Sequence, residues 1–206
     1  MARKGVGSLR RSQVVTSFGP GATIDLPDIS VVIGGLDWWK GYERERIIEP
    51  RLEEKVAHAL GVERITLYAP PAEVQDPHGP MFGIPVDQFP LWFVADVDHR
   101  RGRARSRPLV HRNGAPDGKF EYERKKYAVT PVRFVQACAN GHIADIEWYE
   151  FTHNGRTACR RPLWIDEYGT SGDLTDGVVR CECKAERALA QATRRDVLGQ
   201  CKGQRP

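Results

Sequence analysis

The 206-residue chain lacks the sequence features of several large protein classes. It has no apolar run of 18 residues, so no membrane span is expected, and no apolar signal core follows its basic N-terminus. It has no phosphate-binding Gly-Lys-Ser/Thr, no His-Glu-x-x-His pair, no Gly-x-Ser-x-Gly elbow and no dinucleotide fingerprint. These absences favour a cytoplasmic protein without a recognisable catalytic engine.

Cysteine is scarce, with five residues, but four of the five lie within a stretch of 43 residues. The odd number argues against a framework made only of disulfides, and soft thiolates gathered in this way are typical ligands of tetrahedral zinc. Four thiolates leave no position for water, so the sequence predicts a structural zinc site. Reduced cysteines packed as small apolar side chains, or a disulfide, are the alternatives. The predicted ligands are Cys159, Cys181, Cys183 and Cys201.

A second set of metal-ligand residue types lies just upstream. Cys138 and His142 have a spacing that suits one metal ion, and Asp145 and His153 follow closely. With Asp145 or a water in the last position, this site would be of the open, catalytic kind. A cysteine–histidine nucleophile pair is a further alternative. The simplest alternative is a turn in which His142 bonds the backbone and Cys138 is buried.

Positive charge is concentrated in one segment. The chain has a formal net charge of +4, yet residues 99–126 alone hold ten Lys/Arg and three Asp/Glu. Guanidinium groups match phosphate oxygens, so the segment predicts salt-dependent contact with nucleic acid. A solubilising loop, or a loop that contacts an acidic protein, is the alternative. The predicted contact residues are Arg100, Arg101, Arg103, Arg105, Arg107, Arg112, Lys125 and Lys126.

The pattern of apolar residues predicts a mixed α+β fold with short strands, few helices and a zinc-stapled C-terminal module. Strands are expected near residues 10–15, 30–33, 91–94, 127–135 and 178–180. Helices are expected over residues 49–60, 144–151 and 185–192. Six prolines between residues 70 and 90 indicate a connector. It divides an N-terminal α+β region, 1–90, from the basic and Cys/His region, 91–206, unless the two form one continuous domain.

Several motifs together resemble DrmB-type proteins of the DISARM anti-phage system. They are Gly19-Pro20-Gly21-Ala22, Phe89-Pro90-Leu91-Trp92-Phe93, Val132-Arg133-Phe134-Val135, Gly141-His142-Ile143 and Val179-Arg180-Cys181-Glu182-Cys183. The resemblance implies a non-catalytic subunit that binds a helicase-like ATPase and, with it, DNA.

The chain departs from the family pattern in three ways. Family members tend to carry a cysteine pair where this chain has residues 94–98, and a glycine where it has Lys184. They are also longer, so the resemblance implies that a separate polypeptide could supply the missing C-terminal half.

Two rival hypotheses belong to other functional classes. In the first, the protein is a metal-dependent hydrolase or nuclease that acts through Cys138, His142, Asp145 and His153. In the second, it is a pure assembly module that completes a split partner and touches no DNA. Its interface candidates are Trp38, Trp39, Trp92 and Trp164.

Overall fold

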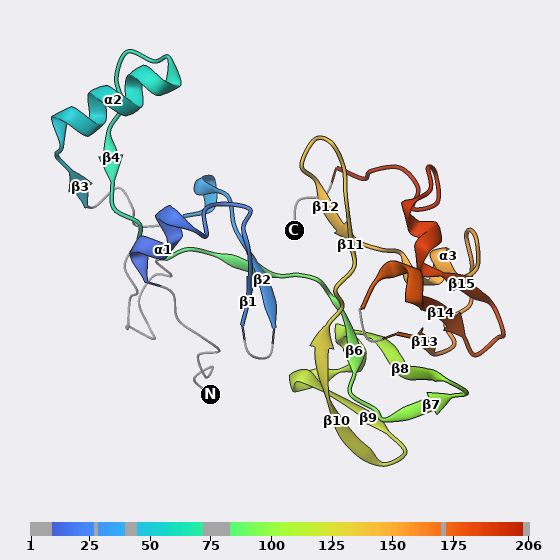
Figure 1. Cartoon of the computed structure of the whole chain (residues 1–206). Coiled ribbons are helices and arrows are strands. Elements are labelled where there is room, and N and C mark those ends of the chain that lie inside the picture. Colours follow the sequence, from blue (N-terminus) through green and yellow to red (C-terminus); the bar gives the residue numbers. More distant parts are fainter. Residues whose placement is uncertain (1–9, 27–28, 40–44, 72–82, 170–171, 204–206) are drawn as a thin grey trace. The chain divides into compact units, whose positions relative to one another are not determined.

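The chain folds into two units. One is formed by residues 1–26 and 31–87, and the other by residues 27–30 and 88–206. The computed structural model describes residues 10–26, 29–39, 45–71, 83–169 and 172–203 (Figure 1). Each unit is considered by itself. Residues 72–82 of the predicted connector lie outside the described part, and the predicted domain division at residues 90 and 91 stays a prediction.

The first unit combines short helices with small antiparallel sheets. Its longest element is α2 (Pro50–Leu60), which begins at a proline and ends at Gly61, whose φ of +66° is the left-handed conformation that favours glycine. The predicted helix over residues 49–60 is therefore confirmed. The strands pair in the order β1–β2–β5 and, separately, β3–β4. The other elements are α1 (Arg11–Thr16), β1 (Thr23–Asp25), β2 (Ser30–Ile33), β3 (Arg46–Ile47), β4 (Leu67–Tyr68) and β5 (Val86–Gln88).

The second unit is built on one antiparallel sheet of eight strands. Seven strands follow the order β15–β14–β13–β8–β6–β10–β9, and β7 pairs with β8 beside the end of β6. A separate hairpin, β11–β12, precedes α3 (Figure 1). The bounds are β6 (Trp92–Ala95), β7 (His99–Arg101), β8 (Ala104–His111), β9 (Lys119–Tyr122), β10 (Lys125–Pro131), β11 (Val135–Ala137), β12 (Ile143–Asp145), α3 (Trp148–Thr152), β13 (Leu163–Glu167), β14 (Gly177–Cys181) and β15 (Glu186–Ala188).

The two faces of this sheet carry different apolar clusters. Residues that are directly paired on neighbouring strands lie on the same face, so the pairing assigns each residue to its cluster. Leu163 is paired with both Leu109 and Cys181, and this face packs against Trp148 and Phe151 of α3. The opposite face holds a second cluster, formed by Phe93, Ala95, Val97, Ala115 and Val129. Both apolar faces are therefore used, which fixes the register of the central strands.

Three sequence expectations about local structure are wrong in whole or in part. In the helix expected over residues 144–151, residues 144 and 145 belong to β12 and the helix begins at Trp148. The segment expected as a strand near residues 10–15 is α1, in which the side chain of Gln13 accepts from the backbone N–H of Arg10 at 2.9 Å. The segment expected as a helix over residues 185–192 instead forms β15 and a 3-10 turn at Leu189–Thr193. Pairing of β15 with β14 overrides the local helix propensity. The mixed α+β class itself is confirmed. Within the described residues, no helix is long and apolar enough to cross a membrane.

Candidate metal centre and arginine pocket

One histidine and three cysteines converge beside the main core of the second unit. His153 follows the last turn of α3, Cys159 lies before β13, Cys181 ends β14, and Cys183 lies in the turn to β15. Their ligand atoms all lie within 4.8 Å of one another. The His153 Nε2 atom is 3.1 Å from the Cys183 Sγ atom, and the Sγ atoms of Cys159 and Cys181 are 3.6 Å apart.

These separations fit a tetrahedral zinc ion. Bonds of about 2.3 Å to sulfur and about 2.0 Å to nitrogen place two sulfur ligands about 3.7 Å apart, and a sulfur and a nitrogen about 3.5 Å apart. The His153 Nδ1–H group donates to the carbonyl oxygen of Tyr149 at 2.7 Å, which leaves Nε2 free to ligate. Three thiolates and one imidazole form a closed set, so zinc bound here would cross-link three segments and carry no substrate.

The electrostatic environment prepares one of these thiols for metal binding. The pKa of Cys183 is lowered to about 6, chiefly because the backbone N–H of Ala185 donates to its sulfur. Burial raises the pKa of Cys181 to about 11, so this thiol loses its proton only with help from a nearby positive charge such as a metal ion. Binding of zinc would therefore release protons.

The structure corrects the membership of both predicted metal sets. Cys201 does not lie with Cys159, Cys181 and Cys183, because the C-terminal segment carries it to the β11–β12 hairpin, beside Cys138 and His142. His153 takes its place, because α3 packs on the face of the sheet that carries Cys181. The spacing along the chain gave no signal for this exchange.

The predicted hydrolase set is also divided in space. Asp145 belongs to neither group of metal-ligand residues, and its Oδ2 atom accepts from the backbone N–H of Leu91 at 3.0 Å. His153 lies with the other cysteines, so Cys138 and His142 are left with Cys201 as their third neighbour. The structure does not bring the four proposed hydrolase residues together.

The first part of the basic segment is the β7–β8 hairpin, whose arginines point to opposite faces of the sheet. Arg100 is paired with Arg105, and Arg105 with Glu167, so these side chains share one face with Arg107. Arg101 lies on the opposite face, where its Nη1 group donates to Asp166 at 3.2 Å and to Glu186 at 3.4 Å. Arg101, one of the predicted contact residues, therefore lies on the other face of the sheet from Arg100, Arg105 and Arg107.

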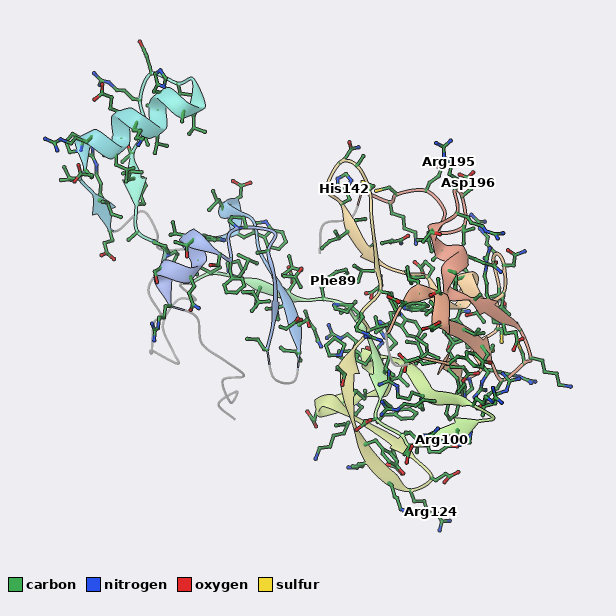
Figure 2. The ribbon with its side chains drawn as sticks, viewed as in Figure 1. Phe89, Arg100, Arg124, His142, Arg195 and Asp196 are labelled. Atoms are coloured by element: carbon green, nitrogen blue, oxygen red, sulfur yellow. The ribbon has the colours of Figure 1, made fainter. Side chains whose placement is uncertain are left out.

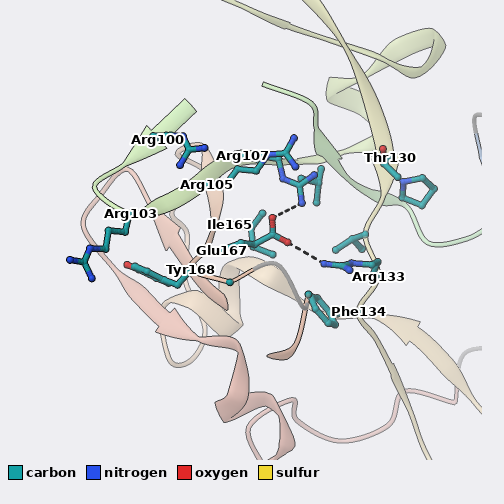
Figure 3. Close-up of a pocket in the computed structure, with 15 residues that line it drawn as sticks. Arg100, Arg103, Arg105, Arg107, Thr130, Arg133, Phe134, Ile165, Glu167 and Tyr168 are labelled. Atoms are coloured by element: carbon teal, nitrogen blue, oxygen red, sulfur yellow. Dashed lines mark hydrogen bonds and ion pairs between the residues drawn. The ribbon is translucent and has the colours of Figure 1, made fainter. Parts of the chain in front are cut away.

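A pocket of about 770 Å³ opens on the first of these faces (Figure 3). Five arginines and a single carboxylate, Glu167, are its charged lining residues in the described part of the chain. Glu167 accepts from Arg107 at 2.6 Å and from Arg133 at 3.1 Å. The lining residues are Val94, Arg100, Arg103, Arg105, Arg107, Thr130, Pro131, Val132, Arg133, Phe134, Ile165, Glu167, Tyr168, Gly169 and Gly172.

The pocket retains uncompensated positive charge. Arg105 donates to Asp96 at 2.8 Å, outside the lining, and Glu167 serves Arg107 and Arg133. Among the residues that the structure describes, Arg100 and Arg103 have no ion-pair partner. A site with these two free guanidinium groups attracts an anion with several oxygens, such as a phosphate.

Two aromatic residues and one arginine of the pocket were not predicted as site residues. Tyr168 is 57% exposed, and the guanidinium of Arg133 lies 5.8 Å from the ring centre of Phe134. The signal in the sequence is the Val132-Arg133-Phe134-Val135 motif, which also carries part of the family resemblance. Arg133 and Phe134 lie in the short link between β10 and β11, which places them at the pocket wall.

The remaining predicted contact residues lie apart from the pocket lining. Arg112 is exposed in the turn after β8. Lys125 and Lys126 are exposed at the start of β10, next to Arg124 at the tip of the β9–β10 hairpin (Figure 2). These three residues therefore form no part of the pocket.

The tryptophans proposed for an interface differ in their exposure. Trp38 is 59% exposed, whereas Trp39 and Trp164 are buried and Trp92 is half-buried. Only the first of the four offers an open apolar surface in the described structure.

Comparison with known proteins places the chain in a family. A family model described as a domain of unknown function, DUF8724, matches residues 10–206. The DISARM protein DrmB of Bacillus paralicheniformis is 34% identical over 70 residues, which are 34% of this chain and 12% of that protein. The predicted resemblance to DrmB is thus confirmed over part of the chain, which covers only a small share of that relative's length. Because the family model spans nearly all of its residues, this chain belongs to the DUF8724 family.

Proposed function

We propose that this protein is a DNA-binding component of a DISARM-type anti-phage defence system, without catalytic activity of its own. The observation that carries the proposal is the pocket in which five arginines face one carboxylate. The partial homology to the DISARM protein DrmB supports the assignment to a defence system.

The pocket suits a nucleic-acid strand better than a small anion. Arg100 and Arg103 can contact phosphate oxygens because neither is engaged by an acidic residue in the described structure. Phe134 and the exposed Tyr168 give two aromatic surfaces on which bases can stack. Phosphate contacts together with stacking produce binding that is strong at low salt and largely independent of sequence.

The zinc centre has a supporting role in this proposal. His153, Cys159, Cys181 and Cys183 form a closed set of ligands, which is typical of structural zinc. By joining the end of α3 to the end of β14, the ion would hold the sheet that presents the arginines. A scaffold of this kind is consistent with an accessory subunit.

The salt dependence of DNA binding tests the pocket directly. The double variant Arg100→Gln/Arg103→Gln should bind a labelled oligonucleotide more weakly, and the slope of log K against log salt should fall by about 1.4 for a single strand or about 1.8 for a duplex. Arg194→Gln/Arg195→Gln is the matched control, because it removes the same charge from two exposed residues outside the pocket lining. Fluorescence anisotropy at several NaCl concentrations measures both quantities.

Two results would reject DNA as the ligand of the pocket. One is an unchanged salt slope in the double variant with an intact fold. The other is equally tight binding of polyglutamate peptide in competition, which would assign the arginines to an acidic protein instead.

The proposal also includes a helicase-like ATPase as partner, as the family resemblance implies. Co-expression of the chain with its genomic neighbours, followed by native mass spectrometry, should reveal a complex that contains an ATPase. Trp38 is the first residue to vary, because exposed tryptophans are frequent anchors of protein interfaces. A solitary chain in that experiment would refute the partnership without affecting the test of DNA binding.

A further inference from the structure

The turn of the β11–β12 hairpin and the C-terminal segment meet at a second group of ligand atoms. His142 Nδ1 lies 3.4 Å from the Cys138 Sγ atom and 3.5 Å from the Cys201 Sγ atom. All three ligand atoms lie within 4.8 Å of one another. Figure 2 labels His142 at the tip of this hairpin. These residues are separate from both the arginine pocket and the first zinc centre.

The distances suit a single zinc ion better than a disulfide. In a tetrahedral zinc site a sulfur and a nitrogen ligand lie about 3.5 Å apart, and both sulfurs here stand at about that distance from the same ring nitrogen. A disulfide between Cys138 and Cys201 would not use His142 at all. The donor set of two thiols and one imidazole matches the ligand preference of zinc.

The hairpin turn is shaped to hold a thiolate. The backbone N–H groups of His142 and Asn140 donate to the Cys138 sulfur. The turn is closed by a hydrogen bond from the Gly141 N–H to the Cys138 carbonyl, at 3.0 Å. Gly141 has a φ of +77°, a conformation that side chains rarely adopt. The turn therefore places Cys138 and His142 on the same side.

The fourth side of the group is open. Among the described residues, no further His, Cys, Asp or Glu belongs to this group of ligand atoms. Cys201 is exposed, and the three ligands line a hollow of about 140 Å³, which is roomy for a water, whose share of liquid volume is about 30 Å³. A water or another small ligand can thus complete a tetrahedral site.

We propose that Cys138, His142 and Cys201 bind a second zinc ion, which fastens the C-terminal segment to the β11–β12 hairpin and keeps one exchangeable coordination position. The ion acts as a clasp because Cys201 is 59 residues from His142 in sequence and lies beyond all regular elements. Lys202, which donates to Glu147, strengthens the same attachment from the neighbouring position. The proposal does not depend on DNA binding.

Metal content of the full chain tests the clasp. The protein is loaded with Zn²⁺, freed of unbound ion and weighed by native mass spectrometry. The wild type should hold two zinc ions per chain, and Cys201→Ser should hold one while its near-ultraviolet circular dichroism stays unchanged. Lys202→Gln is the matched control, because it removes the neighbouring ion pair and should keep both ions.

Cobalt substitution tests the open position independently. Added imidazole should change the visible spectrum of the Co²⁺-loaded wild type, and Cys201→Ser should lose this response. Hydrogen exchange over residues 194–203 should accelerate in the same variant. The clasp is refuted if Cys201→Ser holds as many zinc ions as the wild type, or if the zinc-loaded chain forms a Cys138–Cys201 disulfide when dissolved oxygen is supplied as the oxidant.

Discussion

If zinc occupies the group formed by His153, Cys159, Cys181 and Cys183, as proposed, removal of one of these ligands should unfold the second unit. Cys183→Ser takes away the thiol with the lowered pKa and leaves His153, Cys159 and Cys181 as an incomplete set. Cys181 is part of the main apolar cluster, and Cys159 and Cys183 pack against it. Loss of the ion therefore acts on the core itself and not on a peripheral loop.

The magnitude follows from the two free energies involved. Structural zinc contributes an apparent binding free energy of about 10–16 kcal/mol at neutral pH in small zinc domains. The total free energy of unfolding of a typical domain is about 5–15 kcal/mol. A loss on the order of 10 kcal/mol would equal or exceed the free energy of unfolding of the second unit. The variant should therefore be unfolded in the absence of denaturant.

Two buried tryptophans report this unfolding. Trp148 and Trp164 belong to the second unit and are 0% and 5% exposed. Their fluorescence and near-ultraviolet circular dichroism should resemble those of the urea-unfolded wild type, both in Cys183→Ser and in wild type treated with a tight zinc chelator. Cys201→Ser is the control with an equal chemical change outside the centre. An unchanged urea midpoint after complete removal of zinc would refute a structural role for the ion.

Three further predictions concern buried or partly buried residues of the second unit. Asp166→Asn leaves the half-buried Arg180 without its anion and should cost about 3–5 kcal/mol in urea unfolding. Burial raises the pKa of Asp145 in the folded state above its unfolded value of 3.8. This carboxyl therefore contributes stability at pH values below the unfolded pKa, and the contribution is lost as the pH rises through the folded pKa. Asp145→Asn should flatten that decline in a pH series of thermal melts. Leu163→Ala should cost about 2–5 kcal/mol because Leu163 is 1% exposed, whereas Leu52→Ala, at 45% exposure, should cost about 0.5 kcal/mol or less.

Local sequence signals predicted the elements whose ends are marked by particular residues. Pro50 and Gly61 bracket α2 because a proline fits the first helical turn and a glycine adopts the left-handed conformation at the end. The strand at residues 178–180 was predicted from β-branched residues and is β14. The prediction of a helix at residues 185–192 is wrong, because the backbone groups of Glu186–Ala188 pair with β14. Helix propensity is a local property and does not include such pairing with a distant strand.

The metal ligands show the limit of spacing along the chain. Three of the four predicted thiols do meet, since Cys181 and Cys183 are two residues apart and the β13–β14 pairing brings Cys159 close. The fourth ligand depends on where α3 packs and where the C-terminal segment ends, and neither is a local property. The sequence pattern thus indicated which residue types gather here but not which of them gather together, and occupancy by zinc stays a prediction.

The arginine pocket depends on the alternation of side chains along β7 and β8, which the charge of the segment alone does not resolve. Once residues 99–107 are two strands joined at Gly102, Arg101 must face away from Arg100, and it meets the buried Asp166 there. Asp166 also accepts hydrogen bonds from Ser106 and Arg180, so it fixes β8 against β13 on the face opposite the pocket. These hydrogen bonds hold the two strands whose other face presents the pocket residues.

The balance of charge in the pocket then has a physical reason. Five guanidinium groups around one hollow would repel one another if none were compensated. Glu167 bridges Arg107 and Arg133, while Asp96 holds Arg105 from outside, so the walls are stabilised by ion pairs. The charge that is left on Arg100 and Arg103 is free to attract a ligand. We therefore expect Glu167→Gln to disorder the pocket walls and not to strengthen anion binding. Tighter anion binding by that variant, with the pocket structure unchanged, would contradict this division of roles.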